Sequence, residues 1–300
     1  MSSHALPIYE SGMFVRFAYI GMKIKSMSIQ IMGVLNVTPD SFSDGGCFLV
    51  KENAINHALG LVRDGAHIID IGGESTRPGA KPVSIEEECE RVIPVIEALK
   101  KQTDVCISID TRHTAVMKEA IKAGVDVIND VNALMDQGAI ELIAQHQVKV
   151  CLMHMQGTPA SMQQAPSYQD VVRDIWDFLS SRVLACQNAG ISLDNIWIDP
   201  GFGFGKKLAH NLALLADLAE FKQLGVPVLV GLSRKSMFGE ILNKEVNQRL
   251  YASIAGAVIA AMHGATIIRT HDVAQTKDAL AVVSAVQPFM QRSKADVCFA

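Results

Sequence analysis

The sequence predicts a single (β/α)8 barrel, in which eight parallel strands form a ring inside a layer of helices. Three observations predict it: eight short apolar runs recur along the chain, a segment with helical periodicity follows each run, and every run ends in polar residues. The 300 residues, 49% hydrophobic and 19% charged, suit one soluble α/β barrel with a large core.

The eight apolar runs are rich in Ile and Val and do not alternate in polarity. Such runs are typical of strands buried on both faces, as in a parallel sheet. In chain order the predicted strands are residues 29–35, 67–71, 105–109, 125–128, 149–153, 196–198, 226–231 and 266–268.

The segments between the strands predict helices at residues 53–64, 85–101, 115–123, 138–145, 168–188, 211–224, 248–263 and 273–290. The second of these is expected to begin behind Ser84, because Glu87 stands three residues later, as in a capping box. Several helices are followed by a glycine that suits a left-handed terminator, namely Gly65, Gly124, Gly190, Gly225 and Gly264. Eight strand–helix units favour a closed barrel over the alternative, an open sheet of six or seven strands.

No linker divides the chain, so we expect one catalytic domain at residues 28–292, with an N-terminal extension at 1–27 and a tail at 293–300. The net charge of -4 and the absence of a Lys/Arg cluster argue against nucleic-acid binding. No apolar run is long enough to span a bilayer. The six cysteines show no metal-ligand spacing and favour a reducing compartment, so we expect a cytoplasmic protein that binds small molecules.

All eight predicted strands end in polar residues. One polar residue after a strand is often a cap or a turn former, but in a barrel eight such ends converge on one cavity, the catalytic face. The strand ends are Asn36, Asp70, Asp110, Asn129 with Asp130, His154, Asp199, Ser233 to Lys235, and Arg269 to Asp272.

The residue types at these ends predict two kinds of binding. Asp110, Asn129 and Asp199 offer the partners that a heterocycle with amino, ring N–H and carbonyl groups needs once it is buried. Positive charge and donors gather on strands 7 and 8, the usual phosphate corner of barrels, at Lys235, Arg269 and His271.

Other polar residues are less specific. Asn36 offers an oxygen to a hard cation such as Mg²⁺, and the glycine-rich loops after strands 1 and 2 suit lids. The Gly203, Gly205 and Lys206 segment fits no nucleotide-binding pattern and is interpreted as a tight turn. The position of His154 at a strand end favours a role in the pocket.

Two long segments carry a family resemblance. Residues 33–46, GVLNVTPDSFSDGG, and residues 70–79, DIGGESTRPG, closely resemble the two signature motifs of the dihydropteroate synthase family. Shorter matches follow in the expected order at residues 108–111, 199–206, 233–236 and 269–272. The resemblance extends from about residue 29 to residue 290.

The resemblance implies an enzyme that joins 6-hydroxymethyl-7,8-dihydropterin diphosphate to 4-aminobenzoate, giving 7,8-dihydropteroate and diphosphate. Diphosphate would leave and the aniline nitrogen would attack the pterin methylene. The resemblance also implies Mg²⁺ as cofactor and the aminobenzoate site as a target of sulfonamides. We expect a homodimer that pairs through the last two helices.

Site residues are carried over position by position. The resemblance implies a pterin set of Asp110, Asn129, Met153, Asp199, Gly203, Phe204 and Lys235. It implies a diphosphate and aminobenzoate set of Asn36, Asp40, Phe42, Thr76, Arg77, Pro78, Ser233, Arg269, Thr270 and His271, with Asn36 as the metal ligand. Catalysis would fall to Asp110, Lys235, Arg269 and His271.

Two alternatives share the pterin acids. A methyltransferase barrel acting on methyltetrahydrofolate would not need the Thr38 to Ser43 loop or the cationic corner of Arg269 and His271. A non-catalytic pterin-binding paralogue is expected to lose loop or phosphate residues, and here every motif position is retained.

Overall fold

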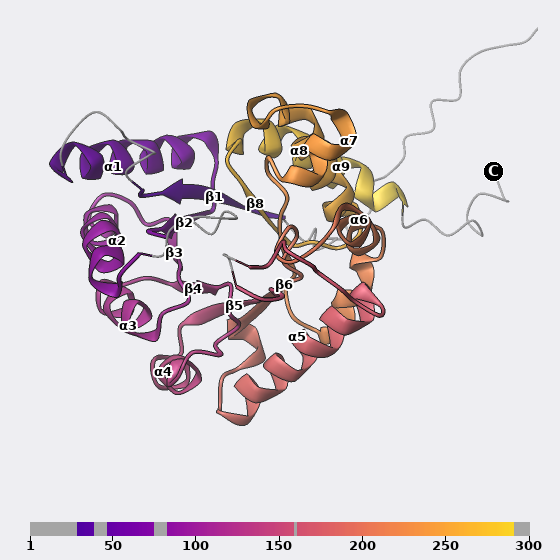
Figure 1. Ribbon diagram of the computed structural model, residues 1–300. Coiled ribbons are helices and arrows are strands. Elements are labelled where there is room, and N and C mark those ends of the chain that lie inside the picture. The colour runs from indigo at the N-terminus through magenta and orange to yellow at the C-terminus, as the bar shows by residue number, and fades with distance from the viewer. Residues whose placement is uncertain (1–28, 39–46, 75–82, 159–160, 291–300) are drawn as a thin grey trace, which may run out of the picture.

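The structure, a computed structural model, describes residues 29–38, 47–74, 83–158 and 161–290, so the predicted extension and tail lie outside the described residues. Eight parallel strands form a ring, with helices around it (Figure 1). The strands are β1 (Gln30–Asn36), β2 (Ile68–Gly72), β3 (Cys106–Asp110), β4 (Val127–Asp130), β5 (Lys149–Met153), β6 (Ile196–Asp199), β7 (Leu229–Gly231) and β8 (Ile267–Thr270).

The ring closes between β6 and β7. The strand order is β6-β5-β4-β3-β2-β1-β8-β7, and an isolated parallel bridge between Ile198 and Val228 joins its two ends. The amide of Ile198 donates to the carbonyl of Pro227 at 3.0 Å across the same junction. The predicted (β/α)8 barrel is therefore confirmed.

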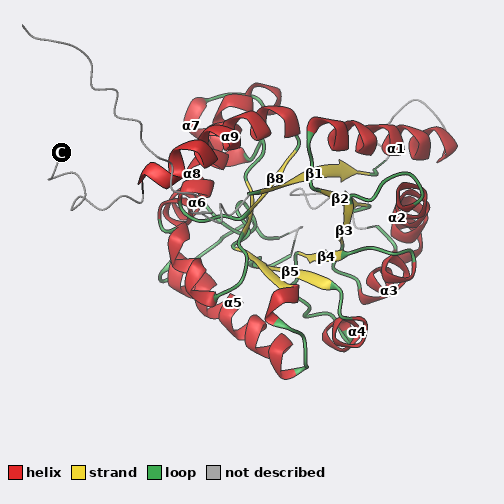
Figure 2. Cartoon of the chain, turned by 180° about the vertical axis from the view of Figure 1, so that it is seen from behind, coloured by secondary structure: helices red, strands yellow, loops and turns green. Residues whose placement is uncertain are grey.

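Helices cover the outside of the barrel, as the view from behind also shows (Figure 2). They are α1 (Cys47–Asp64), α2 (Ile85–Lys100), α3 (Thr114–Lys122), α4 (Ala139–His146), α5 (Val171–Asn188), α6 (Leu208–Ala216), α7 (Ser236–Leu242), α8 (Leu250–Met262) and α9 (Val273–Met290). Short 3-10 helices are η2 (Leu193–Asn195), η3 (Leu218–Leu224) and η4 (Val246–Gln248). Among the described helices, none is both long enough and apolar enough to cross a membrane.

Three helices differ from the prediction. The first helix begins at Cys47 rather than at residue 53, and residues 47–52 contain no Gly or Pro that would stop it. The predicted helix at 211–224 is instead α6 followed by η3, whose three-residue turn places the buried Leu218 and Phe221 on one side. The sequence did not predict α7, because seven residues are too few for a clear helical period.

The predicted helix ends are mostly confirmed. Ser84 caps α2, and its Oγ accepts from the amide of Glu87 at 3.2 Å. The Glu87 carboxylate pairs with Arg91 instead of completing the capping box. The five predicted terminator glycines all have positive φ.

The inside of the barrel is layered. Its floor is an apolar cluster of Met32, Ile68, Val127, Cys151, Trp197, Leu229 and Ile267. Side chains two residues further along a strand point the same way, because successive side chains alternate. In this sequence those positions include a polar layer, which we define as Asp70, Ser108, Asn129, Asp199 and Arg269. The strands therefore present polar groups above a dry floor, at the end where the loops begin.

Candidate active site

Arg269 lies across the mouth of the barrel and binds two carboxylates. Its Nε lies 2.6 Å from Asp70 Oδ2, and its Nη2 lies 2.8 Å from Asp110 Oδ2. β1 separates β8 from β2, so the guanidinium reaches over one strand to contact the next two. Two of the predicted site residues, Arg269 and Asp110, are thus brought together.

Asp70 is a site residue to which the sequence assigned no role. It is 0% exposed, and its Oδ2 also accepts a hydrogen bond of 3.1 Å from Asn129 Nδ2. Within the described residues, Asp70 Oδ1, Ser108 Oγ and Asn129 Oδ1 are buried without a hydrogen-bond partner. An acid inside an otherwise apolar strand was the available signal, since a buried charge needs a specific partner.

Several groups in the site have displaced pKa values. Burial raises the pKa of Asp110 to about 7, with Asp70 adding to the rise and Arg269 opposing it. Burial also raises the pKa of Asp199 to about 6, against the hydrogen bond from the Gly201 amide. Burial and the charge of Arg269 lower the pKa of Lys235 to about 8. Acids and a base that titrate near neutral pH are typical of functional sites.

Other members of the predicted pterin set come from the ends of β5 and β6 and from the loops after β6 and β7. Met153 and Asp199 are register partners at the ends of β5 and β6. Lys235 Nζ lies 4.3 Å above the centre of the Phe204 ring. The amide of Gly203 donates to Asn211 Oδ1 at 2.8 Å, which fixes the loop below Phe204. Asp199, Lys235 and Arg269 are close enough to shift one another's pKa values, which brings these predicted site residues to the same end of the barrel.

Lys206 holds this loop from behind, a role that the sequence did not reveal. Its buried ammonium donates to the carbonyl oxygens of Gly201 at 2.7 Å and Phe204 at 3.0 Å. It also lies 3.0 Å from Nδ1 of His154, whose pKa burial lowers to about 3, so this neutral ring accepts. His154 packs edge-on against Phe178, with ring centres 5.0 Å apart. The sequence favoured a pocket role for His154, but the structure gives it a supporting one behind the loop.

Two glycines allow the loop after β6 to pass close to the end of β5. A Cβ on Gly201, which has φ 73°, would lie 1.9 Å from the carbonyl oxygen of His154. A Cβ on Gly205, which has φ 66°, would lie 2.5 Å from the carbonyl oxygen of Gln156. The glycine-rich segment is therefore the tight turn that the sequence predicted.

The loops after β7 and β8 are tied together at the predicted anion corner. The amide of His271 donates to Ser233 Oγ at 3.2 Å, and Nδ1 of His271 lies 3.0 Å from the same oxygen. Arg234 has φ 58° and makes two bonds to Asp272, of 2.6 and 3.2 Å. Thr270 Oγ1 accepts from the amide of Asp272 at 3.1 Å, which turns the backbone at this corner.

Asn36 is the last residue of β1 and lies close to Gly72 and Asp110. A Cβ built on Gly72 would lie 3.8 Å from Asn36 Oδ1 and 4.0 Å from Asp110 Oδ2, so both oxygens face the space above Gly72. Amide and carboxylate oxygens are the donors that Mg²⁺ prefers. Arg269 already binds Asp110 Oδ2, so Asn36 Oδ1 is the oxygen of this pair that fits the expected cation.

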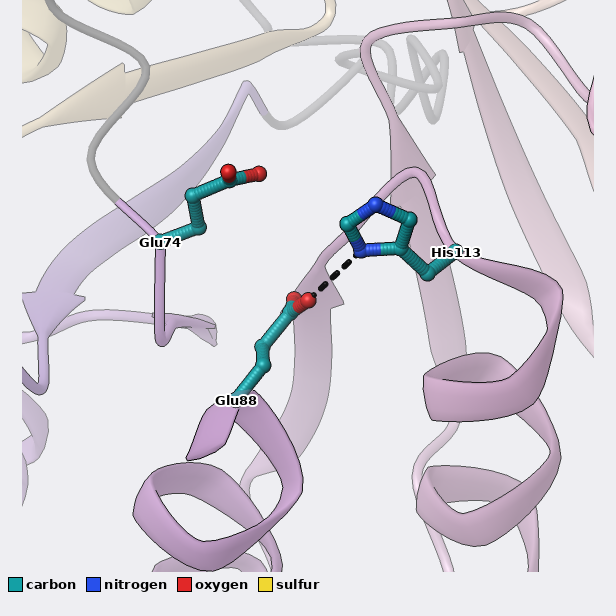
Figure 3. Close-up of side chains that lie close together, drawn as sticks. All are labelled: Glu74, Glu88 and His113. Atoms are coloured by element: carbon teal, nitrogen blue, oxygen red, sulfur yellow. Dashed lines mark hydrogen bonds and ion pairs between the residues drawn. The ribbon is translucent and has the colours of Figure 1, made fainter. Parts of the chain in front are cut away.

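A second cluster of possible metal ligands lies beside the site (Figure 3). Glu74, Glu88 and His113 offer ligand atoms within 4.8 Å of one another. Arg112 Nε and Nη2 bind the Glu74 carboxylate at 3.1 and 3.2 Å, and His113 Nδ1 lies 2.8 Å from Glu88 Oε2. Glu74 Oε1 also accepts from the amide of Val83 at 3.3 Å. Because a guanidinium already neutralises Glu74, we interpret the cluster as a cross-link between the segments that follow β2 and β3.

Five predicted residues of the diphosphate and aminobenzoate set lie outside the described residues, namely Asp40, Phe42, Thr76, Arg77 and Pro78.

Comparison with known proteins identifies relatives over most of the chain. The family described as "Pterin binding enzyme" matches residues 32–271. The dihydropteroate synthase of Escherichia coli K12 is 52% identical over 255 residues, which cover 85% of this chain and 90% of the relative.

Two solved structures share the fold as well as the sequence. The Yersinia pestis dihydropteroate synthase, in a sulfonamide drug complex, has TM-score 0.83 and 51% identity and covers 88% of this chain and 96% of its own. The Xanthomonas albilineans dihydropteroate synthase in complex with 7,8-dihydropteroate has TM-score 0.80 and 48% identity, covering 87% and 94%.

We expect Gly201→Ala to disrupt the loop after β6, and Gly225→Ala provides a matched control. The two glycines have φ 73° and 72°, but a Cβ on Gly225 meets nothing within 4 Å. Both changes carry the backbone strain of roughly 1–2 kcal/mol, and Gly201→Ala must also displace the His154 carbonyl. Urea unfolding should show a loss of about 3 kcal/mol or more for Gly201→Ala. Equal losses for the two variants would contradict this account of the loop.

Proposed function

This chain belongs to the dihydropteroate synthase family, and on that premise we propose that it is a transferase of an alkyl group. It would move the pterin-methyl group of 6-hydroxymethyl-7,8-dihydropterin diphosphate onto the nitrogen of 4-aminobenzoate. The observation that carries the proposal is the polar layer above the apolar floor, with acids, an amide and one cation at the same end of the barrel. The 52% identity to the Escherichia coli K12 dihydropteroate synthase disfavours the methyltransferase alternative.

The pterin would bind between Asp110 and Asn129 on one side and Phe204 and Lys235 on the other. Asp110, Asn129 and Asp199 would pair with the amino and ring N–H groups of the heterocycle, because a polar edge without a partner is costly once buried. Met153 and Phe204 would contact its faces, and Lys235 would donate to its acceptors. The position of Lys235 above Phe204 supports this arrangement.

Arg269 connects the pterin residues with the anion corner. It contacts Asp110, and His271, two residues further along the chain, is bonded to Ser233. The C–O bond between the pterin methylene and diphosphate would break, and its electron pair would leave with the diphosphate. Arg269 and His271 would stabilise the charge that develops on the leaving oxygen. Thr270 would contribute through the backbone turn that it holds at this corner.

The amine nitrogen of 4-aminobenzoate would then form the new C–N bond and release a proton to solvent. An aniline is neutral at pH 7, so this step needs no strong base. Asn36 would hold Mg²⁺, which when bound supplies positive charge to the diphosphate. Ser233 would line the aminobenzoate site, together with Asp40, Phe42, Thr76, Arg77 and Pro78 from the two loops.

The outer face of α8 and α9 supports the proposal of a homodimer. α8 contains no charged residue, although a helix that is apolar all round is normally buried. Tyr251 is nevertheless 83% exposed, and Val282 on the neighbouring α9 is 64% exposed. Ile259 and Met262 on α8 and Val286 on α9 are further exposed apolar side chains of these two helices. A second copy of the chain would cover it.

A cytoplasmic location is proposed on the cysteines. Cys89, Cys106, Cys151 and Cys186 are free thiols. Free thiols are the usual state in a reducing compartment.

Turnover of the two substrates with Mg²⁺ tests the function. Sustained release of diphosphate, together with formation of 7,8-dihydropteroate, should require both pterin diphosphate and 4-aminobenzoate. Arg269→Ala should lower kcat by about 10²-fold or more, since one donor to a developing charge is removed, whereas the surface variant Arg173→Ala should not. Unchanged turnover in Arg269→Ala would refute the role of Arg269. Pterin binding without any diphosphate release by the native chain would instead indicate the non-catalytic paralogue.

Pterin affinity should fall as pH rises through about 8, because burial lowers the pKa of Lys235 to about 8 and only the ammonium form donates with a charge. Lys235→Arg retains its charge, since a guanidinium does not titrate in this range. Calorimetric titration with 6-hydroxymethylpterin above and below this pH should therefore show that the native protein loses affinity at high pH, whereas Lys235→Arg does not. The ligand's own titration is common to both proteins. The same alkaline loss in both would contradict the assignment.

Val282→Lys should convert the dimer into a monomer, because it places a charge in the apolar surface of α8 and α9. Leu184→Lys on α5, where Leu184 is 57% exposed, is the matched control and should leave the dimer intact. Sedimentation velocity distinguishes the two states. A dimer that survives Val282→Lys would place the interface elsewhere.

A further inference from the structure

Asp70 occupies the centre of the site without being accessible to a ligand. It lies on β2 in register with Val34 of β1 and Ser108 of β3, and its exposed fraction is 0%. A carboxylate at this depth cannot touch a substrate bound at the mouth. Any part it takes in the reaction must act through its neighbours.

One oxygen of Asp70 serves two neighbours at once. Asp70 Oδ2 accepts from Arg269 Nε at 2.6 Å and from Asn129 Nδ2 at 3.1 Å. Arg269 belongs to the diphosphate end of the site and Asn129 to the pterin end. The single carboxylate therefore connects the two halves of the proposed reaction.

The contact also fixes the orientation of both neighbours. A carboxylate can only accept hydrogen bonds, so the Asn129 amide must turn its nitrogen toward β2 and leave its oxygen on the other side. The guanidinium is planar, so a bond at Nε and a second bond at Nη2 to Asp110 determine its plane. Neither side chain can rotate without breaking its contact with Asp70.

We propose that Asp70 is the positioning residue of this active site, which orients Arg269 toward the leaving diphosphate and Asn129 toward the pterin. The inference rests on the proposed function for its catalytic half. Its binding half, the orientation of Asn129, requires only that the protein binds a pterin.

The decisive variant is Asp70→Asn, which keeps the shape but removes the charge. Its side-chain oxygen can still accept from both donors, but only as a neutral acceptor, so the charge-assisted bond that holds Arg269 is weakened. We expect kcat to fall by about 10²-fold, as for a misplaced catalytic group, and the affinity for 6-hydroxymethylpterin to fall by about tenfold. Kinetics and calorimetry give the two values separately.

Asp130→Asn is the matched control. Asp130 is an equally buried carboxylate at the end of β4, but it accepts from the backbone amides of Asn132 and Leu134 at 2.7 and 2.6 Å. This variant should lower the melting temperature at least as much as Asp70→Asn and leave kcat and pterin affinity within about twofold, because the Asp130 side chain hydrogen-bonds to backbone amides and to neither Arg269 nor Asn129. An equal loss of kcat in both variants would indicate a general loss of structure and overturn the proposal.

A double-mutant cycle with Arg269→Lys separates positioning from an independent effect. If Asp70 acts through Arg269, Asp70→Asn should cost much less kcat in the Arg269→Lys background than in the native one. Fully additive losses, or kcat and pterin affinity of Asp70→Asn within twofold of native, would overturn the proposal.

The proposal can still be tested if Asp70→Asn does not fold or if the native protein is inactive. If Asp70→Asn does not fold, Asp70→Ser removes the same charge while leaving an acceptor, and it is measured in the same way. If the native protein releases no diphosphate, the proposed function fails, yet the calorimetric comparison of Asp70→Asn with Asp130→Asn still decides the binding half of the inference.

Discussion

The guanidinium of Arg269, shared between Asp70 and Asp110, is the interaction on which the site depends. Two neighbouring carboxylates, the buried Asp70 and the partly exposed Asp110, repel each other and lose hydration, and a single planar cation between them offsets both effects. Because β2, β3 and β8 each contribute one member, the interaction also joins strands that are far apart along the chain. Asn129 on β4 extends it to a fourth strand through Asp70.

The interaction is possible because side chains alternate in direction along each strand of the barrel. Residues two apart on a strand point the same way, so a floor of Ile68, Val127 and Ile267 places Asp70, Asn129 and Arg269 directly above it. The loop after β6 is positioned in a different way, because one buried ammonium holds its backbone. Lys206 gathers carbonyl oxygens from the turn after β6, and the neutral His154 ring accepts from it.

Much of this arrangement follows from sequence. The Ile- and Val-rich runs predicted the parallel strands, and the polar residues behind them predicted which side chains converge, as Arg269 and Asp110 illustrate. What could not be predicted is the pairing itself. Nothing local to Asp70 indicates a partner 199 residues away. His154 was misjudged for a related reason, because a strand-end position does not tell whether a ring faces the pocket or the loop behind it.

Arg269 sets the electrostatics of the pterin acids, and direct titration of the Asp110 carboxyl by carbon-detected NMR tests this role. In the native protein the pKa of Asp110 should lie near 7, where burial raises it and Arg269 limits the rise. In Arg269→Met the same carboxyl should titrate at clearly higher pH, because the opposing cation is gone while the neighbouring Asp70 remains. A pKa that stays the same or falls in Arg269→Met would contradict the account.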